Sequence, residues 1–432
     1  MNTKYIKRNS RKYTKKYSRK NTKIQYNRKH TKTHKYFINY CRYDNQNLNY
    51  SFVVKYLMRL GCIPDITMNK IRTRYNHILK THKNITADDL CDYTSKAMQL
   101  APINDPQIFK AINADIFFYN INSGFLDKRL YPFKKYLANV LNIDFANITN
   151  KDVIYNNISH VEPDIASKYF IKTFPINQIK EYKFPGWYIL RPNDSFGGAD
   201  IKYISSKKEL NNAIEYYKTH KNHKGILYGD NVIASLYLVD LLLFRGKKMH
   251  LRLYYIVSCI DGLISSFLLD DGLIRTAYDQ FDMDHPFTKA KHDTHLESTG
   301  ADFSIKKEFT TENIGISGIE SRWPEIYKKC QNMCSRIIKM IITKTNGNIL
   351  YENQRNGYHL FGLDVFITKD LEPVLIECND YPGFGTFTKS GMTNLSIMLF
   401  EWINSIILEP LLKYNRPIPM KAREHKTYIH LD

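Results

Sequence analysis

The sequence lacks the long apolar run that a membrane-spanning helix needs. Such a helix takes about 20 consecutive apolar residues, whereas the best candidate, residues 232–244, contains Asp240 and is only 13 residues long. The N-terminus also lacks the apolar stretch of a secretory signal peptide. We therefore predict no membrane association and expect a cytoplasmic protein.

The cysteines lack the spacing of a zinc site or a disulfide framework. There are seven, an odd number, and they are scattered along the chain. Cys330 and Cys334 lie one helical turn apart, but no second close pair completes a set of four ligands. We expect reduced, buried thiols, as is usual in the cytosol.

Acidic residues are absent from the first 43 positions, which hold 15 Lys and Arg. The remaining residues carry 48 bases against 42 acids, so most of the formal charge of +21 lies in the tail. With almost no aliphatic residues, residues 1–45 cannot offset the entropy of ordering, and we predict a disordered tail. Its basic and tyrosine residues suit nucleic acid, nuclear import or an acidic protein partner, and a tail without a specific role explains them equally well.

The apolar periodicity of the rest predicts sheets covered by helices, an α+β fold. Residues 46–165 show helical patterns near 51–60, 68–81, 87–99 and 127–141, and no chemical motif. Beyond residue 166 we expect strands at 171–175, 187–190, 201–204 and 250–260, and hairpins at 262–277 and 358–379. We expect helices at 208–218, 323–345 and 393–413. No internal repeat is visible.

The segment 358–386, YHLFGLDVFITKDLEPVLIECNDYPGFGT, is the most informative. A symmetric hairpin across its polar turn places Asp364 opposite Glu377, and Asn379 shares a strand face with Glu377. Adjacent carboxylates repel unless a cation lies between them, and two carboxylates with an amide suit Mg²⁺ or Mn²⁺. An exposed sheet face, or an Asp364–arginine pair, would explain the same residues without a metal.

Two further segments carry groups suited to phosphate. In residues 185–204, PGWYILRPNDSFGGADIKYI, a strand that contains Arg191 leads into a loop with Ser195, Gly197 and Gly198. Glycines let a backbone approach an anion closely, although this is not a Walker loop and such hairpins are often only turns.

In the second segment, residues 244–257, Lys248, His250 and Arg252 share one strand face. Arg275 follows at the end of the next strand pair. Arginine suits developing phosphoryl charge because its fork stays protonated. Each of these basic residues could equally be an exposed strand residue or part of a surface ion pair.

These motifs, together with GLIRTAYDQFD, resemble in order the tubulin–tyrosine ligase-like family of ATP-grasp ligases over residues 166–412. The resemblance implies an ATP-grasp fold that clasps Mg-ATP. It also implies that a carboxylate is phosphorylated and then attacked by an amine, which adds tyrosine, glutamate or glycine to tubulin or a related acidic protein. The implied partners are a free amino acid and a protein acceptor with an acidic tail, plausibly tubulin.

The resemblance also implies roles for individual residues. The implied magnesium ligands are Asp364, Glu377 and Asn379. The implied nucleotide contacts are Arg191, Ser195, Gly197, Gly198, Lys248 and His250. Arg252 would act on the transferring phosphoryl group, and Arg275 would hold the acyl phosphate or the acceptor carboxylate.

Several positions depart from the family pattern. A Gln-Lys pair of the family is here Ala234 and Ser235, and the aspartate of the basic strand is His250. The alternative hypothesis is therefore a pseudo-ligase that binds acidic protein or nucleic acid through its tail. The expected division is a tail at 1–45, an N-terminal domain at 46–165, ATP-grasp subdomains at 166–235 and 236–415, and a C-terminal tail at 416–432.

Overall fold

The computed structural model describes part of the chain. The described residues are 35–39, 63–64, 116–119, 136–138, 141–144, 146–178, 183–184, 186–193, 200–222, 225–229, 231–260, 262–284, 287–294, 302–305, 322–351, 354, 356–380, 382, 399, 402–408 and 426–429. Residues 34–432 form one compact unit, and the two sheets described below belong to it.

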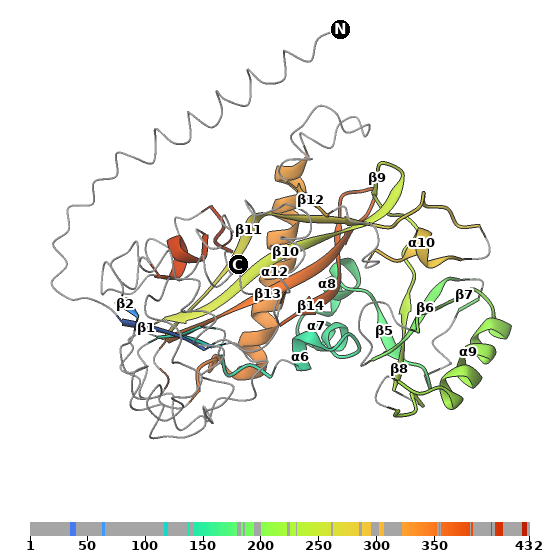
Figure 1. Ribbon diagram of the computed structural model, residues 1–432, viewed down its shortest axis with the longest axis horizontal. Helices are drawn as coiled ribbons and strands as arrows, with labels where there is room; N and C mark the ends of the chain where they lie inside the picture. The colour runs from blue at the N-terminus through green and yellow to red at the C-terminus, as the bar shows by residue number, and fades with distance from the viewer. Residues whose placement is uncertain are drawn as a thin grey trace, which may run out of the picture. The chain divides into compact units, whose positions relative to one another are not determined.

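The larger sheet contains ten of the described strands (Figure 1). Its strands are β1 (Lys35–Asn39), β2 (Ile63–Pro64), β3 (Ile116–Tyr119), β4 (Tyr136–Ala138), β9 (Leu243–Phe244), β10 (Lys247–Ile260), β11 (Leu263–Thr276), β12 (Asp302–Ser304), β13 (Asn356–Ile367) and β14 (Pro373–Asn379). The order is β12-β11-β10-β13-β4-β3-β1-β2, with β14 on β13 and β9 on β10. The long strand β10 lies between β11 and β13 and is antiparallel to both.

The smaller sheet has four described strands in the order β5-β8-β6-β7. They are β5 (Thr173–Pro175), β6 (Tyr188–Pro192), β7 (Lys202–Ile204) and β8 (Val232–Leu236). Helix α9 (Lys207–Thr219) packs on this sheet and buries Leu210, Ala213 and Tyr217. It begins with a capping box, in which Ser206 and Glu209 satisfy each other's backbone N–H groups.

The remaining described helices are α6 (Ala146–Thr149), α7 (Ile154–Val161), α8 (Pro163–Tyr169), α10 (Lys289–His292), α12 (Trp323–Thr345) and a π-helix at Asn404–Leu408. Helix α12, the long orange helix in Figure 1, packs on β11 and β14. Its apolar residues recur every three or four positions, which aligns Cys330, Met333, Ile337 and Ile341 on its buried face. The helix ends at Thr345 and is followed by its C-cap Asn346, whose φ of 49° lies in the left-handed region.

From residue 166 onward most sequence expectations are confirmed within two or three residues, and the hairpin at 262–277 is wrong. Two expectations for earlier residues are also wrong. Residues 262–277 form one strand, β11, because Gly262 (φ 79°) turns the chain between β10 and β11 rather than within them. Residues 136–138 form β4 instead of helix, because parallel pairing with β3 and β13 overrides local periodicity. Residues 35–39, predicted as disordered, form β1 beside β3.

Other predictions fall partly or wholly outside the described residues. Helices near 51–60, 68–81 and 87–99 lie there, as does most of 393–413, of which residues 399 and 402–408 are helical. The domain boundaries stay predictions. Cys330 and Cys334 are buried and form no disulfide.

We expect the buried face of α12 to contribute strongly to stability. Ile337 is fully buried, so Ile337→Ala should lower the free energy of unfolding by about 2–5 kcal/mol, through lost transfer energy and a cavity. Lys328→Ala, at an exposed position of the same helix, is the control. Urea denaturation midpoints measure both. Equal midpoints for the two variants would contradict this packing.

Candidate active site

The register of three strands brings the predicted acidic residues together. Asp364 on β13 lies opposite Glu377 on β14 and, on its other side, opposite Arg252 on β10. Asn379 lies opposite Gly362, and its Nδ2 atom is 3.4 Å from Asp364 Oδ2. The predicted pairing of Asp364 with Glu377 is therefore confirmed. A bulge follows directly between Asp364 and Val365.

Asp364 and Arg252 form a buried, two-armed ion pair. Arg252 Nε lies 2.5 Å from Asp364 Oδ1 and Nη2 lies 2.8 Å from Oδ2, with side-chain exposures of 7% and 1%. Burial acts against the guanidinium charge, but the charge and hydrogen bonds of Asp364 outweigh it and raise the pKa of Arg252. The pairing of Asp364 with an arginine, one of the alternatives to a metal site in the sequence analysis, is therefore present in this structure.

Glu377 also lies next to a cation, which the sequence analysis missed. Lys151, just before α7, places its Nζ atom 3.0 Å from Glu377 Oε2, and both side chains are mostly buried. No pattern near Lys151 distinguishes it from the other 62 Lys and Arg residues. Only the fold, in which the preceding helix α6 packs on β14, shows its place.

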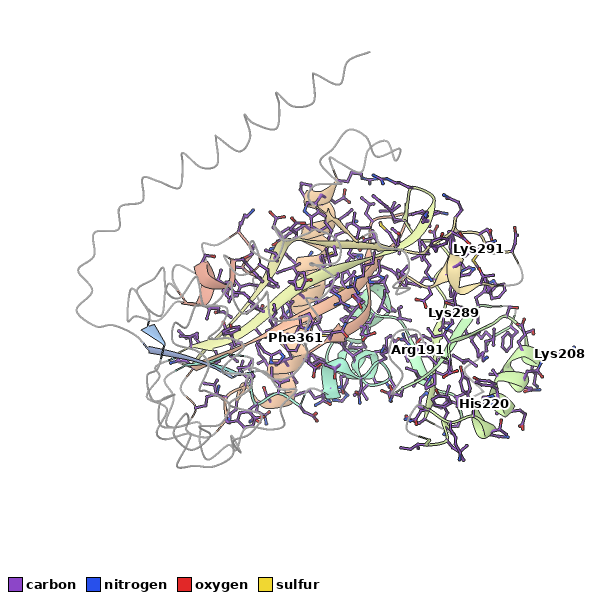
Figure 2. All side chains as sticks on the ribbon, in the orientation of Figure 1. Arg191, Lys208, His220, Lys289, Lys291 and Phe361 are labelled. Atoms are coloured by element: carbon purple, nitrogen blue, oxygen red, sulfur yellow. The ribbon has the colours of Figure 1, made fainter. Side chains whose placement is uncertain are left out.

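Arg191 extends the cation cluster from the smaller sheet. Figure 2 labels it on β6. Desolvation lowers the pKa of Arg191, and the charges of Glu377 and Tyr203 oppose that shift, so the guanidinium lies within electrostatic reach of the carboxylate. Arg191 is thus a second cation, after Lys151, that acts on Glu377.

Lys248 lies in an aromatic enclosure on the same strand as Arg252. Its Nζ atom is 3.2 Å from the Tyr237 hydroxyl and lies over the rings of Tyr237 and Phe366, at 4.3 and 4.9 Å from the centroids. The residue is 2% exposed. Burial lowers the pKa of Lys248 to about 7, and the charge of Asp293 opposes this.

His250 lies between Lys248 and Arg252 and is fully buried. Its Nδ1 atom is 2.6 Å from Thr294 Oγ1, and its Nε2 atom is 3.5 Å from Asp364 Oδ1. Arg275, half-buried on β11, lies opposite His250 and also opposite Asp302 of β12. Ser195, Gly197 and Gly198 lie outside the described residues.

The donor chemistry of the site fits a hard divalent cation. Asp364 and Glu377 supply carboxylate oxygens and Asn379 an amide oxygen, the set that Mg²⁺ or Mn²⁺ takes. In the described part of the chain, no three His, Cys, Asp or Glu side chains come together as a metal site. Arg252, Lys151 and Arg191 already exceed the two carboxylates in charge. A metal ion therefore fits best when it arrives with a phosphate anion.

The family model of the tubulin-tyrosine ligase family matches residues 144–410. The match covers more than half of the sequence and includes Lys151, the basic strand and the carboxylate hairpin. The chain belongs to the tubulin-tyrosine ligase family.

The curated relatives are distant, and the chain matches only part of each. One named as a probable tubulin–tyrosine ligase of Schizosaccharomyces pombe is 22% identical over 256 residues, which is 55% of this chain and 62% of that protein. The tubulin polyglutamylase TTLL11 of Mus musculus is 21% identical over 234 residues, or 48% of this chain and 32% of that protein. The chain therefore matches less than two thirds of the length of either.

The C-terminal domain of K. lactis Pby1, described as an ATP-grasp enzyme that interacts with the mRNA decapping enzyme Dcp2, shares the fold. The TM-score is 0.51 at 17% identity, over 92% of this chain and 98% of that domain. The predicted α+β, ATP-grasp fold is thus confirmed. In the described residues, we find no helix of the length and apolarity that crossing a bilayer requires.

The ion pair at the centre of the site makes a stability prediction. Arg252→Met leaves Asp364 buried without its counter-charge and should cost about 3–5 kcal/mol of unfolding free energy. The double variant Arg252→Met with Asp364→Leu removes that charge as well and should recover much of the loss. Urea denaturation of both measures the difference. A double variant as unstable as the single one would show that the lone charge is not the cause.

Proposed function

We propose that the protein is an ATP- and Mg²⁺-dependent carboxylate–amine ligase that adds an amino acid to a protein acceptor. The observation that carries the proposal is the convergence of Arg252, Lys151 and Arg191 on the Asp364–Glu377 pair, within a fold and family of ATP-dependent ligases. Several relatives are named tubulin polyglutamylases, which favours glutamate as the added amino acid and tubulin as the acceptor. Tyrosine and glycine remain the other candidates from the family.

The proposed reaction has two balanced steps. A carboxylate oxygen attacks the terminal phosphorus of ATP, the bond to the bridging oxygen breaks, and ADP leaves. An amine then attacks the carbonyl carbon of the acyl phosphate, an amide bond forms, and inorganic phosphate leaves with the amine proton passing to a base or to water. The result is one new amide bond for each ATP.

The cations of the site serve the first step. A guanidinium such as Arg252 or Arg191 stays protonated and can offset the charge that develops on the transferring phosphoryl group. Magnesium, when bound by Asp364, Glu377 and Asn379, would neutralise phosphate charge as a Lewis acid. Arg275, on the neighbouring strand, is proposed to orient the acceptor carboxylate or the acyl phosphate.

The basic N-terminal residues are proposed to attract the acidic acceptor. Residues 1–43 carry 15 bases and no acid, and such a charge raises association with an acidic tail at low salt. Nucleic acid is the other polyanion that this segment could bind.

One observation favours the pseudo-ligase as a second candidate. Ala234 and Ser235, which stand where the family pattern has Gln and Lys, are buried in β8. The Ser235 hydroxyl lies 2.9 Å from that of Thr173, so its hydrogen bond goes to the neighbouring strand. A nucleotide site without those two side chains would bind ATP more weakly.

The effect of a substitution at Glu377 on Mg-ATP binding distinguishes the ligase from the pseudo-ligase. Mg-ATP at about 100 times its dissociation constant stabilises a protein by about 2.7 kcal/mol, which raises Tm by a few degrees. We expect this shift in the wild type and its loss in Glu377→Gln, because the amide cannot replace a carboxylate at the metal. Magnesium alone should give no shift, since the site already has excess positive charge.

The control is Glu372→Gln, which changes a carboxylate of the same hairpin that pairs with Lys168 and Lys329. It should keep the nucleotide-dependent shift. ATP turnover with glutamate and tubulin then tests the ligase directly. No shift in any variant, and no turnover, would contradict the ligase and favour the pseudo-ligase.

A further inference from the structure

Lys248 is held by residues to which neither the sequence nor the family match gives a role. Tyr237 follows β8 in the segment that leads out of the smaller sheet, and His292 is the last residue of α10. The Tyr237 hydroxyl lies 3.2 Å from Lys248 Nζ and 2.6 Å from His292 Nδ1. The three polar groups thus form a continuous chain from α10 to β10.

The chemistry of these groups fixes the direction of their hydrogen bonds. An ammonium group has donors and no acceptor, so the Tyr237 oxygen accepts from Lys248. The hydroxyl has one proton, and within the described residues the acceptor that the structure gives it is His292 Nδ1. The Nδ1 atom of His292 must then carry no proton, so the imidazole is neutral. Burial, followed by the charge of Lys248, lowers the pKa of His292 to about 4, which is consistent with that state.

Aromatic rings pack around the hydrogen-bonded series Lys248–Tyr237–His292 and fix its position. The ring of Tyr203 lies 5.8 Å from that of Tyr237, and the ring of Phe287 lies 4.2 Å from that of His292. Trp187 packs on Phe287 at 4.2 Å. Tyr237 and His292 are both less than a tenth exposed, so neither hydroxyl nor imidazole can turn to water without disturbing this packing.

We propose that Tyr237 and His292 are positioning residues for Lys248: the imidazole orients the hydroxyl, and the hydroxyl oxygen holds the ammonium at one point beside the carboxylate hairpin. Lys248 then presents its charge to an anionic ligand without a search over rotamers. The use of that charge for nucleotide rests on the function proposed above, whereas the positioning does not.

Several charged groups of the described residues act on this hydrogen-bonded chain. Asp293 favours the charged form of Lys248. Asp282 and Lys291 act on His292 with opposite signs. His250 lies two residues along β10, and the packed residue from β13 is the apolar Phe366. Among the described residues, Asp293 is the acidic group that acts on Lys248, and the hydroxyl oxygen of Tyr237 adds a direct contact that stabilises the ammonium form.

The ligand-free test is the pH dependence of unfolding. The folded pKa of Lys248, about 7, lies below the value of an exposed lysine. At pH values between these two pKa values, the unfolded chain binds more protons at Lys248 than the folded protein does. The contribution of Lys248 to the free energy of unfolding therefore rises with pH above about 7. Subtracting the Lys248→Met curve isolates this rise.

Tyr237→Phe keeps the ring but removes the hydroxyl. The reference for this variant is the double variant Tyr237→Phe with Lys248→Met. After subtraction, the rise of stability with pH should begin about one pH unit lower than in the wild type, because the ammonium form of Lys248 has lost a hydrogen-bond acceptor. Tyr203→Phe, which removes a hydroxyl from the same aromatic cluster, is the matched control and should leave the midpoint unchanged. Coincident midpoints for the wild type and Tyr237→Phe would overturn the proposal.

His292 separates positioning from packing. His292→Asn keeps an acceptor for the Tyr237 hydroxyl, so the pH midpoint of the Lys248-dependent rise in stability should stay as in the wild type. His292→Leu removes the acceptor, so this pH midpoint should move to lower pH, as in Tyr237→Phe. Equal midpoints in the asparagine and leucine variants would overturn the role of His292.

A calorimetric titration with Mg-ATP links the chain of hydrogen bonds to the site. In buffers of different ionisation heat, proton uptake on binding at pH 8 should be smaller in Lys248→Arg than in the wild type, because arginine is already charged. Absence of binding heat would contradict the proposed function, and the unfolding curves would still decide the positioning. Binding with equal proton uptake in both proteins would contradict the use of Lys248 by the nucleotide.

Discussion

The contact on which the site depends is the buried pair of Arg252 and Asp364. An isolated charge in this position would cost several kcal/mol, so each side chain makes the burial of the other acceptable. The pair also fixes the relative position of β10 and β13, on which the other groups are carried. Lys248 and His250 precede Arg252 on one strand, while Glu377 and Asn379 flank Asp364 across the hairpin. One ion pair therefore aligns the basic face of one strand with the acidic end of its neighbour.

A good part of this arrangement could be read from the sequence, because strands follow simple rules. Alternation put Lys248, His250 and Arg252 on one face. A symmetric turn predicts the pairing of Asp364 with Glu377; the pairs nearer the turn are offset from that register by one residue, and the bulge between Asp364 and Val365 restores it. Helix α12 followed from its apolar spacing in the same way. These are local patterns, and each residue's place depends on its near neighbours in the chain.

What the sequence did not disclose are the contacts between distant segments. Lys151 reaches Glu377 only because α6, which it follows, packs on β14. His292 meets Tyr237 only because α10 returns to the end of β8. Strand β4 arises from pairing with β13, against its local periodicity. In a chain with 63 basic residues, no composition signal marks the few that become buried. Their environment is a property of the fold.

The ion pairs of the site join residues that are far apart in the chain: Arg252 and Asp364 are separated by 112 positions, and Lys151 lies still further from Glu377. Contacts of such separation form late, because the entropy of closing long loops must be offset first. During synthesis, Arg252 exists for a long interval before its acid partner has been made. Until the carboxylate hairpin has been synthesised, Arg252 on β10 has no Asp364 to pair with, and burying its charge would cost several kcal/mol. The site is therefore completed only when the sheet is, and a chain that ends before β13, which carries Asp364, should lack a native core as well as an active site.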